Sequence, residues 1–193
     1  MQAHQPTDST AYEAVQHRMT IAILISTQLG DIHVELYPDK APITVANFLR
    51  YVDAGYYTDG SFWRTCTLNP DNQPNNEIKI EVIQGTVRAD QADAKFDPIS
   101  LERTTLTGLH HGDGAISMGR FAPDSAQCDF FICINDQPSL DFGGMRNPDG
   151  QGFAAFGQVT AGMDVVRAIN RAPLVEQTLT PPLAIHHITR LLP

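Results

Sequence analysis

Residues 114–140, GAISMGRFAPDSAQCDFFICINDQPSL, indicate the fold class of this chain. Two short apolar runs, residues 115–118 and 130–134, lie on either side of a polar segment containing Pro123, Asp124 and Ser125. Short apolar runs with aromatic and β-branched residues are typical of strands, and Pro, Asp and Ser are typical of turns. The stretch therefore predicts a polar loop held between two core strands.

Adjacent phenylalanines on the second predicted strand suggest a binding surface. Successive strand residues face opposite sides, so if Phe130 points into the core, Phe131 points away from it. An aromatic ring on a rigid strand beside a polar loop could form the floor of a binding site. Burial of both rings in the core is the more common outcome of such a pattern, and the two alternatives stay open at this point.

Length and charge limit the classes of protein to which the chain can belong. Its 193 residues fit one domain, with or without a tail, and its net charge of −9 argues against nonspecific binding to nucleic acid or to an anionic membrane. No apolar run approaches the roughly 18 residues of a membrane-spanning helix. The three cysteines, Cys66, Cys128 and Cys133, lack a disulfide pattern and favour a reducing compartment.

The first 18 residues differ from the rest of the chain. They are polar and contain no apolar segment typical of an intact signal peptide. We expect a disordered N-terminal arm over residues 1–18 and a single domain over residues 19–193. Removal of a signal sequence upstream would also be compatible with this pattern.

Alternation and helical spacing predict the first elements of the domain. Residues 21–36 alternate around a Gly-containing turn and predict a β-hairpin. Residues 41–55 predict an amphipathic helix, with Pro42 in its first turn, Gly55 after its end and an apolar stripe formed by Val45, Phe48, Leu49 and Val52. Such a helix can cover one open end of a sheet or barrel.

Most of the remaining predicted elements are strands. We expect strands at residues 61–66, 78–85, 153–159 and 185–192, and a short helix at residues 162–170. The segments 67–77 and 141–152, rich in Asn, Asp, Pro and Gly, predict surface loops. Many strands, two separated helices and no βαβ alternation favour a mainly β fold, a closed antiparallel barrel with helical lids.

Two histidine pairs lack the spacing of a metal site. His110–His111 and His186–His187 are adjacent rather than four residues apart, and strand neighbours point in opposite directions. We therefore expect no metal site at either pair.

Six segments, in register from about residue 21 to residue 192, resemble the cyclophilin-type peptidyl-prolyl cis-trans isomerases. Each segment is similar to one motif of that family. They are GDIHVELYPDKAPITVANFL (30–49), FWR (62–64), VIQG (82–85), GAISMGR (114–120), DFFICI (129–134) and FAAFGQVTAGMDVVRAI (153–169). The resemblance implies an eight-stranded antiparallel β-barrel closed by two α-helices, in agreement with the fold class predicted from the strands.

The resemblance also implies an activity and a site. Arg64 stands at the catalytic arginine, and Gln84 stands at the glutamine that hydrogen-bonds the substrate backbone. The implied substrates are X-Pro bonds in peptides and unfolded protein clients, with no cofactor or metal. We expect a monomer in the cytoplasm, or in the periplasm if a signal sequence has been removed. The substrate-binding positions implied by the resemblance are Phe131, Leu140, Val82, Gly119, Phe153 and Phe62.

Several positions depart from the family pattern around this implied site. Glu81 aligns with a pocket phenylalanine, Asp129 with a glutamine, Ser139 with a tryptophan and Phe153 with a histidine. These departures leave a second function open, a non-catalytic cyclophilin-like module that binds proline-containing segments. An isomerisation assay separates the two functions.

Overall fold

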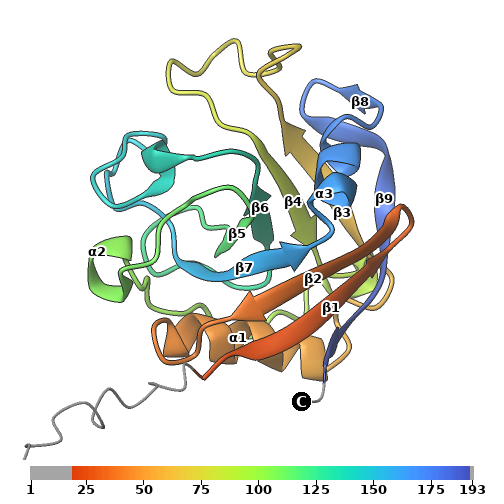
Figure 1. The fold of residues 1–193 in the computed structure, drawn as a ribbon, viewed down its shortest axis with the longest axis vertical. Coiled ribbons are helices and arrows are strands. Elements are labelled where there is room, and N and C mark those ends of the chain that lie inside the picture. Colours follow the sequence, from red (N-terminus) through yellow and green to blue (C-terminus); the bar gives the residue numbers. More distant parts are fainter. Residues whose placement is uncertain (1–18, 192–193) are drawn as a thin grey trace, which may run out of the picture.

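The computed structural model describes residues 19–191, so the predicted arm over residues 1–18 lies outside the described residues. Strands are the main elements of the described part (Figure 1). They are β1 (Ile21–Thr27), β2 (Gly30–Leu36), β3 (Gly60–Cys66), β4 (Val82–Thr86), β5 (Ala115–Met118), β6 (Phe130–Cys133), β7 (Ala155–Ala161), β8 (Leu174–Val175) and β9 (Thr178–Arg190).

Eight of these strands close into an antiparallel barrel. The order around the sheet is β1-β2-β7-β5-β6-β4-β3-β9, and β9 also pairs with β1, which closes the ring. The remaining strand, β8, pairs only with β9 and forms a short hairpin outside the ring. The predicted mainly β barrel is confirmed, and closure leaves the eight ring strands without a free edge.

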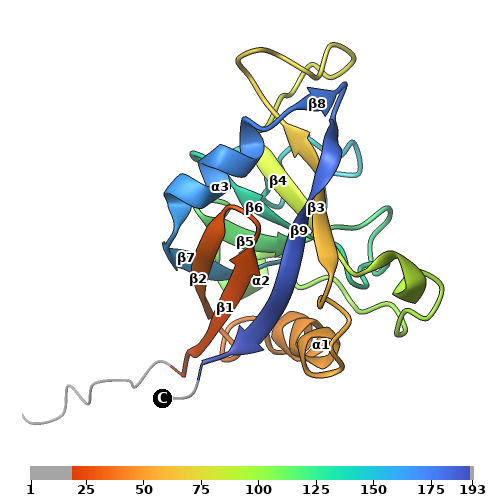
Figure 2. The ribbon, with the colours of Figure 1, turned by 90° about the vertical axis from the view of Figure 1, so that its right-hand side faces the viewer.

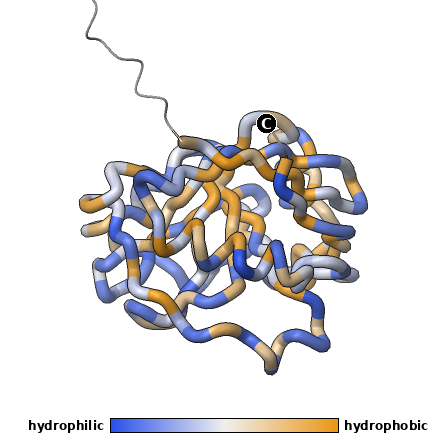
Figure 3. The backbone as a smooth tube through the Cα atoms, turned by 90° about the horizontal axis from the view of Figure 1, so that it is seen from below, coloured by the Kyte–Doolittle hydropathy of each residue, from blue (hydrophilic) through white to orange (hydrophobic). Residues whose placement is uncertain are grey.

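The barrel core follows the alternation seen in the sequence. Along β2, the buried residues Ile32, Val34 and Leu36 alternate with more exposed ones, and hydrophobic and hydrophilic residues alternate along much of the chain (Figure 3). On β6, Phe130 is fully buried in the main core inside the barrel. Phe131 instead belongs to a separate, smaller apolar cluster.

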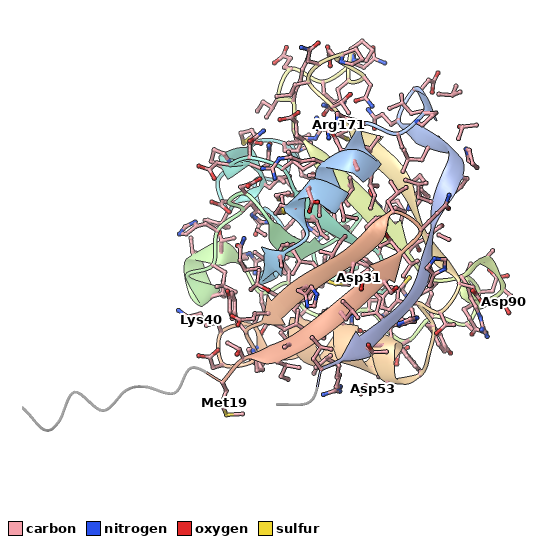
Figure 4. The ribbon with its side chains drawn as sticks, turned by 45° about the vertical axis from the view of Figure 1, so that its right-hand side comes forward. Met19, Asp31, Lys40, Asp53, Asp90 and Arg171 are labelled. Atoms are coloured by element: carbon pink, nitrogen blue, oxygen red, sulfur yellow. The ribbon has the colours of Figure 1, made fainter. Side chains whose placement is uncertain are left out.

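Helix α1 (Pro42–Asp53) covers one end of the barrel, as the amphipathic pattern predicted (Figure 2). Phe48 on its inner face contacts Phe130 and Phe156, with ring centroids 5.5 and 5.2 Å apart. The backbone of Gly55, just after the helix, has φ +72°, a conformation that favours glycine. Asp53, labelled in Figure 4, accepts a hydrogen bond from Arg190 Nε at 2.8 Å and ties α1 to β9.

The second long helix, α3 (Met163–Asn170), lies against β2, β3 and β4, away from α1 (Figure 2). Its Val166 and Ile169 side chains are buried in the main core. Between β4 and β5 the chain also contains η1 (Ala89–Gln91) and the one-turn helix α2 (Thr104–Thr107). No helix among residues 19–191 is long and apolar enough to cross a membrane.

Several predicted strand boundaries were wrong, and the strand expected at residues 153–159 spans Ala155–Ala161. The strand expected at residues 78–85 begins only at Val82, because the backbone of Ile80 bonds a side chain instead of a neighbouring strand. Gln73 Nε2 donates to the Ile80 carbonyl at 2.8 Å, and the Ile80 N–H donates to Gln73 Oε1 at 3.2 Å. The last strand, β9, begins at Thr178 rather than at residue 185, because its first part pairs with β3 and β8.

Candidate active site

Neighbouring strands place the two predicted catalytic residues side by side. Arg64 on β3 is paired in register with Gln84 on β4, and Arg64 Nη1 donates to Gln84 Oε1 at 3.0 Å. An irregularity in β3 between Phe62 and Arg64 shifts the register at Trp63. The strand thereby buries Phe62 in the core and presents Arg64, two residues later, at the outer surface of the barrel.

Strand β6 supplies an apolar floor beside these polar groups. Phe131 is paired in register with Gln84, and the residue is 6% exposed. Phe153 contacts the Phe131 ring edge-on, with centroids 5.5 Å apart and an interplanar angle of 87°. Both phenylalanines are therefore buried, but in different clusters: Phe130 lies in the main core, and Phe131 lies in the smaller cluster and lines the cavity.

These residues line a cavity of about 490 Å³. Its wall contains both predicted catalytic residues and nearly all of the predicted substrate-binding residues. Its lining consists of Trp63, Arg64, Ile80, Val82, Gln84, Gly119, Arg120, Phe121, Asp129, Phe131, Leu140, Arg146, Asn147, Pro148 and Phe153. Such a volume lies within the usual range for ligand sites, where a few polar groups converge on an apolar wall.

Phe62 is the exception among the predicted substrate-binding residues. Its side chain is fully buried in the main core, where its ring contacts Phe130 with centroids 5.8 Å apart. It does not line the cavity. The assignment was wrong because Phe62 lies on the inward-facing side of β3, opposite to the surface that carries Arg64.

Near β4, the residue that lines the cavity is not the one that the family resemblance indicated. Glu81, aligned with a pocket phenylalanine, accepts a hydrogen bond from Asn135 Nδ2 at 2.8 Å and is absent from the cavity lining. Ile80, which is 5% exposed, lines the cavity instead. The chain before β4 therefore places an apolar side chain at the wall, one residue earlier than the alignment indicated.

The loop at residues 141–152, predicted only as a surface loop, forms one side of the cavity through Arg146, Asn147 and Pro148. Arg120 anchors this loop, because its two terminal nitrogens donate to the Asp149 carboxylate at 2.7 and 2.9 Å. The same guanidinium lies 4.8 Å from the centre of the Phe153 ring. The hydrogen bonds from Arg120 lower the pKa of Asp149. The sequence contains the oppositely charged residues Arg120 and Asp149, but they are 29 positions apart, so their contact could not be recognised from the sequence.

Behind the apolar floor lies a chain of three hydrogen-bonded polar groups. His111 Nδ1 lies 2.6 Å from Asp141 Oδ1, and His111 Nε2 lies 2.9 Å from the Ser117 hydroxyl. The order Asp-His-Ser matches that of a hydrolase triad, but Ser117 is fully buried and does not line the cavity. The His111 ring stacks on Phe131, with centroids 5.9 Å apart and planes at 15°. The arrangement therefore supports the floor of the cavity.

The chemistry of the cavity is that of a peptide site. A cationic guanidinium and an amide lie at one edge of an apolar floor, so the cavity can bind a small apolar ring and hydrogen-bond the adjacent backbone. Among residues 19–191, no group of three or more His, Cys, Asp or Glu side chains is arranged to hold a metal ion. The fold and the site define a closed-barrel protein with a largely apolar cavity beside a fixed arginine.

Comparisons with known proteins identify the family. The family described as "Cyclophilin type peptidyl-prolyl cis-trans isomerase/CLD" matches residues 22–190. A peptidyl-prolyl cis-trans isomerase of Acinetobacter baylyi is 33% identical over 150 residues, which cover 77% of this chain and 71% of the relative. Peptidyl-prolyl cis-trans isomerase B of Escherichia coli is 33% identical over 148 residues, covering 76% and 82% of the two chains.

A solved structure agrees with the fold. The cyclophilin-type isomerase of Cryptosporidium parvum has a TM-score of 0.71 at 19% identity, covering 91% of this chain and 99% of that one. A second structure of the same protein, solved in the presence of the dipeptide Ala-Pro, has a TM-score of 0.69 at 20% identity, covering 89% and 99% of the two chains. This chain belongs to the cyclophilin-type peptidyl-prolyl cis-trans isomerase family, and it is a peptidyl-prolyl cis-trans isomerase.

Proposed function

We propose that Arg64 and Gln84, at the edge of the apolar cavity, isomerise X-Pro bonds in peptides and unfolded proteins and so assist protein folding. One observation carries this proposal: the Arg64 guanidinium is hydrogen-bonded to Gln84 directly beside the wall that contains Phe131. A cavity of this kind suits a proline ring with its preceding peptide bond at the cationic edge.

The chemistry requires only that the twisted bond be bound more tightly than either planar form. X-Pro bonds exchange over tens to hundreds of seconds because twisting removes amide resonance, with a barrier of about 20 kcal/mol. The twisted prolyl nitrogen regains a lone pair. A fixed guanidinium near that nitrogen favours the twisted form, which lowers the barrier without breaking any bond.

Gln84 can serve both Arg64 and the substrate. Its Oε1 accepts from Arg64, and its Nε2 has no hydrogen-bond partner among the described residues. The free amide N–H groups can therefore donate to a backbone carbonyl of the peptide. We assign the apolar residues Val82, Phe131, Leu140 and Phe153 to the proline ring and Gly119 to the substrate chain, since all of them line the cavity.

The test is a protease-coupled isomerisation assay on a short peptide with one X-Pro bond. We expect the wild-type protein to accelerate the slow phase and Arg64→Ala to lose most of that acceleration. A folded wild-type protein that binds the peptide without accelerating the slow phase would support the binding module instead. A wild-type rate in folded Arg64→Ala would reject the assignment of Arg64.

We also propose that the protein works as a monomer in a reducing compartment, namely the cytoplasm. All three cysteines are buried and free. Burial raises the pKa of Cys66 and of Cys128, so both thiols stay protonated and unreactive at neutral pH. Cell fractionation tests this proposal, and recovery of the protein in the periplasm would reject it. Light scattering at assay concentration tests the monomer.

A further inference from the structure

Arg64 has a second partner that the sequence did not indicate. Gln177, in the turn between β8 and β9, lies 113 positions away along the chain. Its Oε1 atom accepts from Arg64 Nε at 3.0 Å and from Arg64 Nη2 at 2.6 Å. The Gln177 amide oxygen thus accepts from both Nε and Nη2 of the guanidinium, while Gln84 Oε1 accepts from Nη1.

Gln177 is itself held in place by the loop at residues 67–77. Gln177 Nε2 donates to the Asn72 carbonyl at 3.1 Å. The Asn72 amide in turn donates to the carbonyls of Thr65 and Glu176, at 2.9 and 3.1 Å. The loop therefore holds the nitrogen end of the Gln177 amide, while Arg64 bonds its oxygen end.

We infer that Gln177 is a positioning residue that fixes the orientation of the Arg64 guanidinium for isomerisation. This inference rests on the proposed role of Arg64. The reason is geometric, because a guanidinium can rotate about its long side chain unless more than one edge is held. Gln84 alone fixes one nitrogen, whereas Gln84 and Gln177 together bond all three.

The hydrogen bonds to Gln84 and Gln177 leave part of the Arg64 guanidinium available to the substrate. A guanidinium has five N–H groups. Three of them are used by Gln177 and Gln84, so one N–H remains on each terminal nitrogen. Arg64 also borders a second cavity, of about 620 Å³, that is lined by the 67–77 loop and the hairpin. Without Gln177, the guanidinium could turn toward that cavity and away from the apolar floor.

The experiment replaces the Gln177 acceptor by a side chain of similar length. Gln177→Met removes the hydrogen bonds to Arg64 while keeping an unbranched apolar stem. We expect kcat for a short X-Pro peptide to fall by roughly tenfold with little change in KM, because misplacing a reacting group by about 1 Å can cost roughly 100-fold. A wild-type kcat in folded Gln177→Met would overturn the inference.

A double-mutant cycle separates positioning from general destabilisation. If Gln177 acts through Arg64, adding Gln177→Met to Arg64→Ala should change the remaining rate by less than about twofold. An undiminished tenfold loss in the double variant would show that Gln177 acts elsewhere and would overturn the inference. Val175→Ala, on the same hairpin and 63% exposed, is the control and should keep the wild-type rate.

A measurement on the wild-type protein needs no variant. Proton exchange at Arg64 Nε–H, followed by nitrogen NMR, should be slower than at Arg171, whose side chain has no hydrogen-bond partner among the described residues. Equal exchange rates at the two arginines would overturn the inference.

A wild-type rate in Arg64→Ala would reject the proposed function together with this inference. A slow Arg64→Ala beside a wild-type Gln177→Met would reject this inference alone.

Discussion

Arg64 combines a positive charge with a fixed orientation, and the two properties have different origins. The charge belongs to the side chain, whereas the orientation comes from hydrogen bonds to Gln84 and Gln177 on separate elements. A lysine at this position would keep the charge and lose the planar set of donors. The consequences of that difference can be measured.

We expect Arg64→Lys to lower kcat/KM for a short X-Pro peptide by at least about tenfold. Loss of one fixed donor at a developing charge typically costs roughly 100- to 1,000-fold, so tenfold is a lower bound. Thermal unfolding should shift little, because the side chain is partly exposed and makes no ion pair among the described residues. Equal kcat/KM values for Arg64→Lys and wild type would show that charge alone is sufficient.

Ser139 stands at the position that the resemblance aligns with tryptophan, beside a residue that lines the cavity. It is half-buried and directly precedes Leu140, which lines the cavity. We expect weak inhibition by cyclosporin-type ligands, because Ser139 offers neither an indole N–H nor an apolar wall. Ser139→Trp should therefore be inhibited at lower drug concentration than the wild type in the same assay. Nanomolar inhibition of the wild type would contradict this and would point to Phe121, which is 93% exposed at the rim.

At the scale of elements, the 67–77 loop has more structure than its composition predicts. It lies between β3 and β4 and outside the barrel, as expected, but its Gln73 side chain is fully buried. The Gln73 side chain hydrogen-bonds both the N–H and the carbonyl of Ile80, and it also donates to the Thr67 carbonyl at 3.1 Å. The loop is a surface loop, as its composition predicted, but Gln73 gives it a buried anchor that the composition did not indicate.

We therefore expect Gln73→Ala to destabilise the protein. The substitution leaves the buried N–H and carbonyl of Ile80 without their side-chain partner, which costs about 1–3 kcal/mol for an unsatisfied buried group. Urea unfolding should show a lower midpoint at an unchanged slope. Asn75→Ala is the matched control, because Asn75 is exposed in the same loop and should unfold as the wild type does. Equal midpoints for Gln73→Ala and Asn75→Ala would show that Gln73 does not support the loop.

At the scale of the whole molecule, one carboxylate links segments that lie apart in the sequence. Asp141 accepts from the His111 backbone at 3.1 Å and contacts both histidine rings of the 110–111 pair. Burial of the carboxyl opposes its ionisation, but the hydrogen bonds from His111 and His110 outweigh burial and lower the pKa of Asp141. The lowered pKa predicts how stability depends on pH.

The contribution of Asp141 to stability depends on pH, because its pKa differs between the folded and unfolded states. A carboxyl whose pKa is lower in the folded state stabilises the protein above its unfolded pKa of about 3.9, and this stabilisation is lost as pH falls through the folded pKa. We expect Asp141→Asn to be less stable than the wild type at pH 7, with the difference shrinking below about pH 4. Urea unfolding from pH 7 to pH 2.5 measures this. A difference that is constant with pH would show that the charge of Asp141 contributes nothing.

Much of the fold could be predicted from the sequence because its signals are local. Alternation in β1 and β2, the apolar stripe of α1 and the paired runs of β5 and β6 each depend on neighbours along the chain. The family motifs also indicated Arg64, Gln84 and Phe131 as residues of one site, and they do line one cavity. Phe62 was misassigned because a motif match does not tell which side of a strand faces inward.

The tertiary structure decided how those residues are held. Gln177 and Arg120 act on partners 113 and 29 positions away that the fold brings near. Gln73 and His111 bond partners only seven and six positions away, but no sequence pattern marks those contacts. Polar side chains on loops look alike in a sequence whether they face water or satisfy a buried backbone group. Sequence alone therefore determined the barrel, the family and the residues that we propose to meet the substrate. Only the folded chain determined which distant side chains fix their orientation, because hydrogen bonds depend on distances that sequence separation does not set.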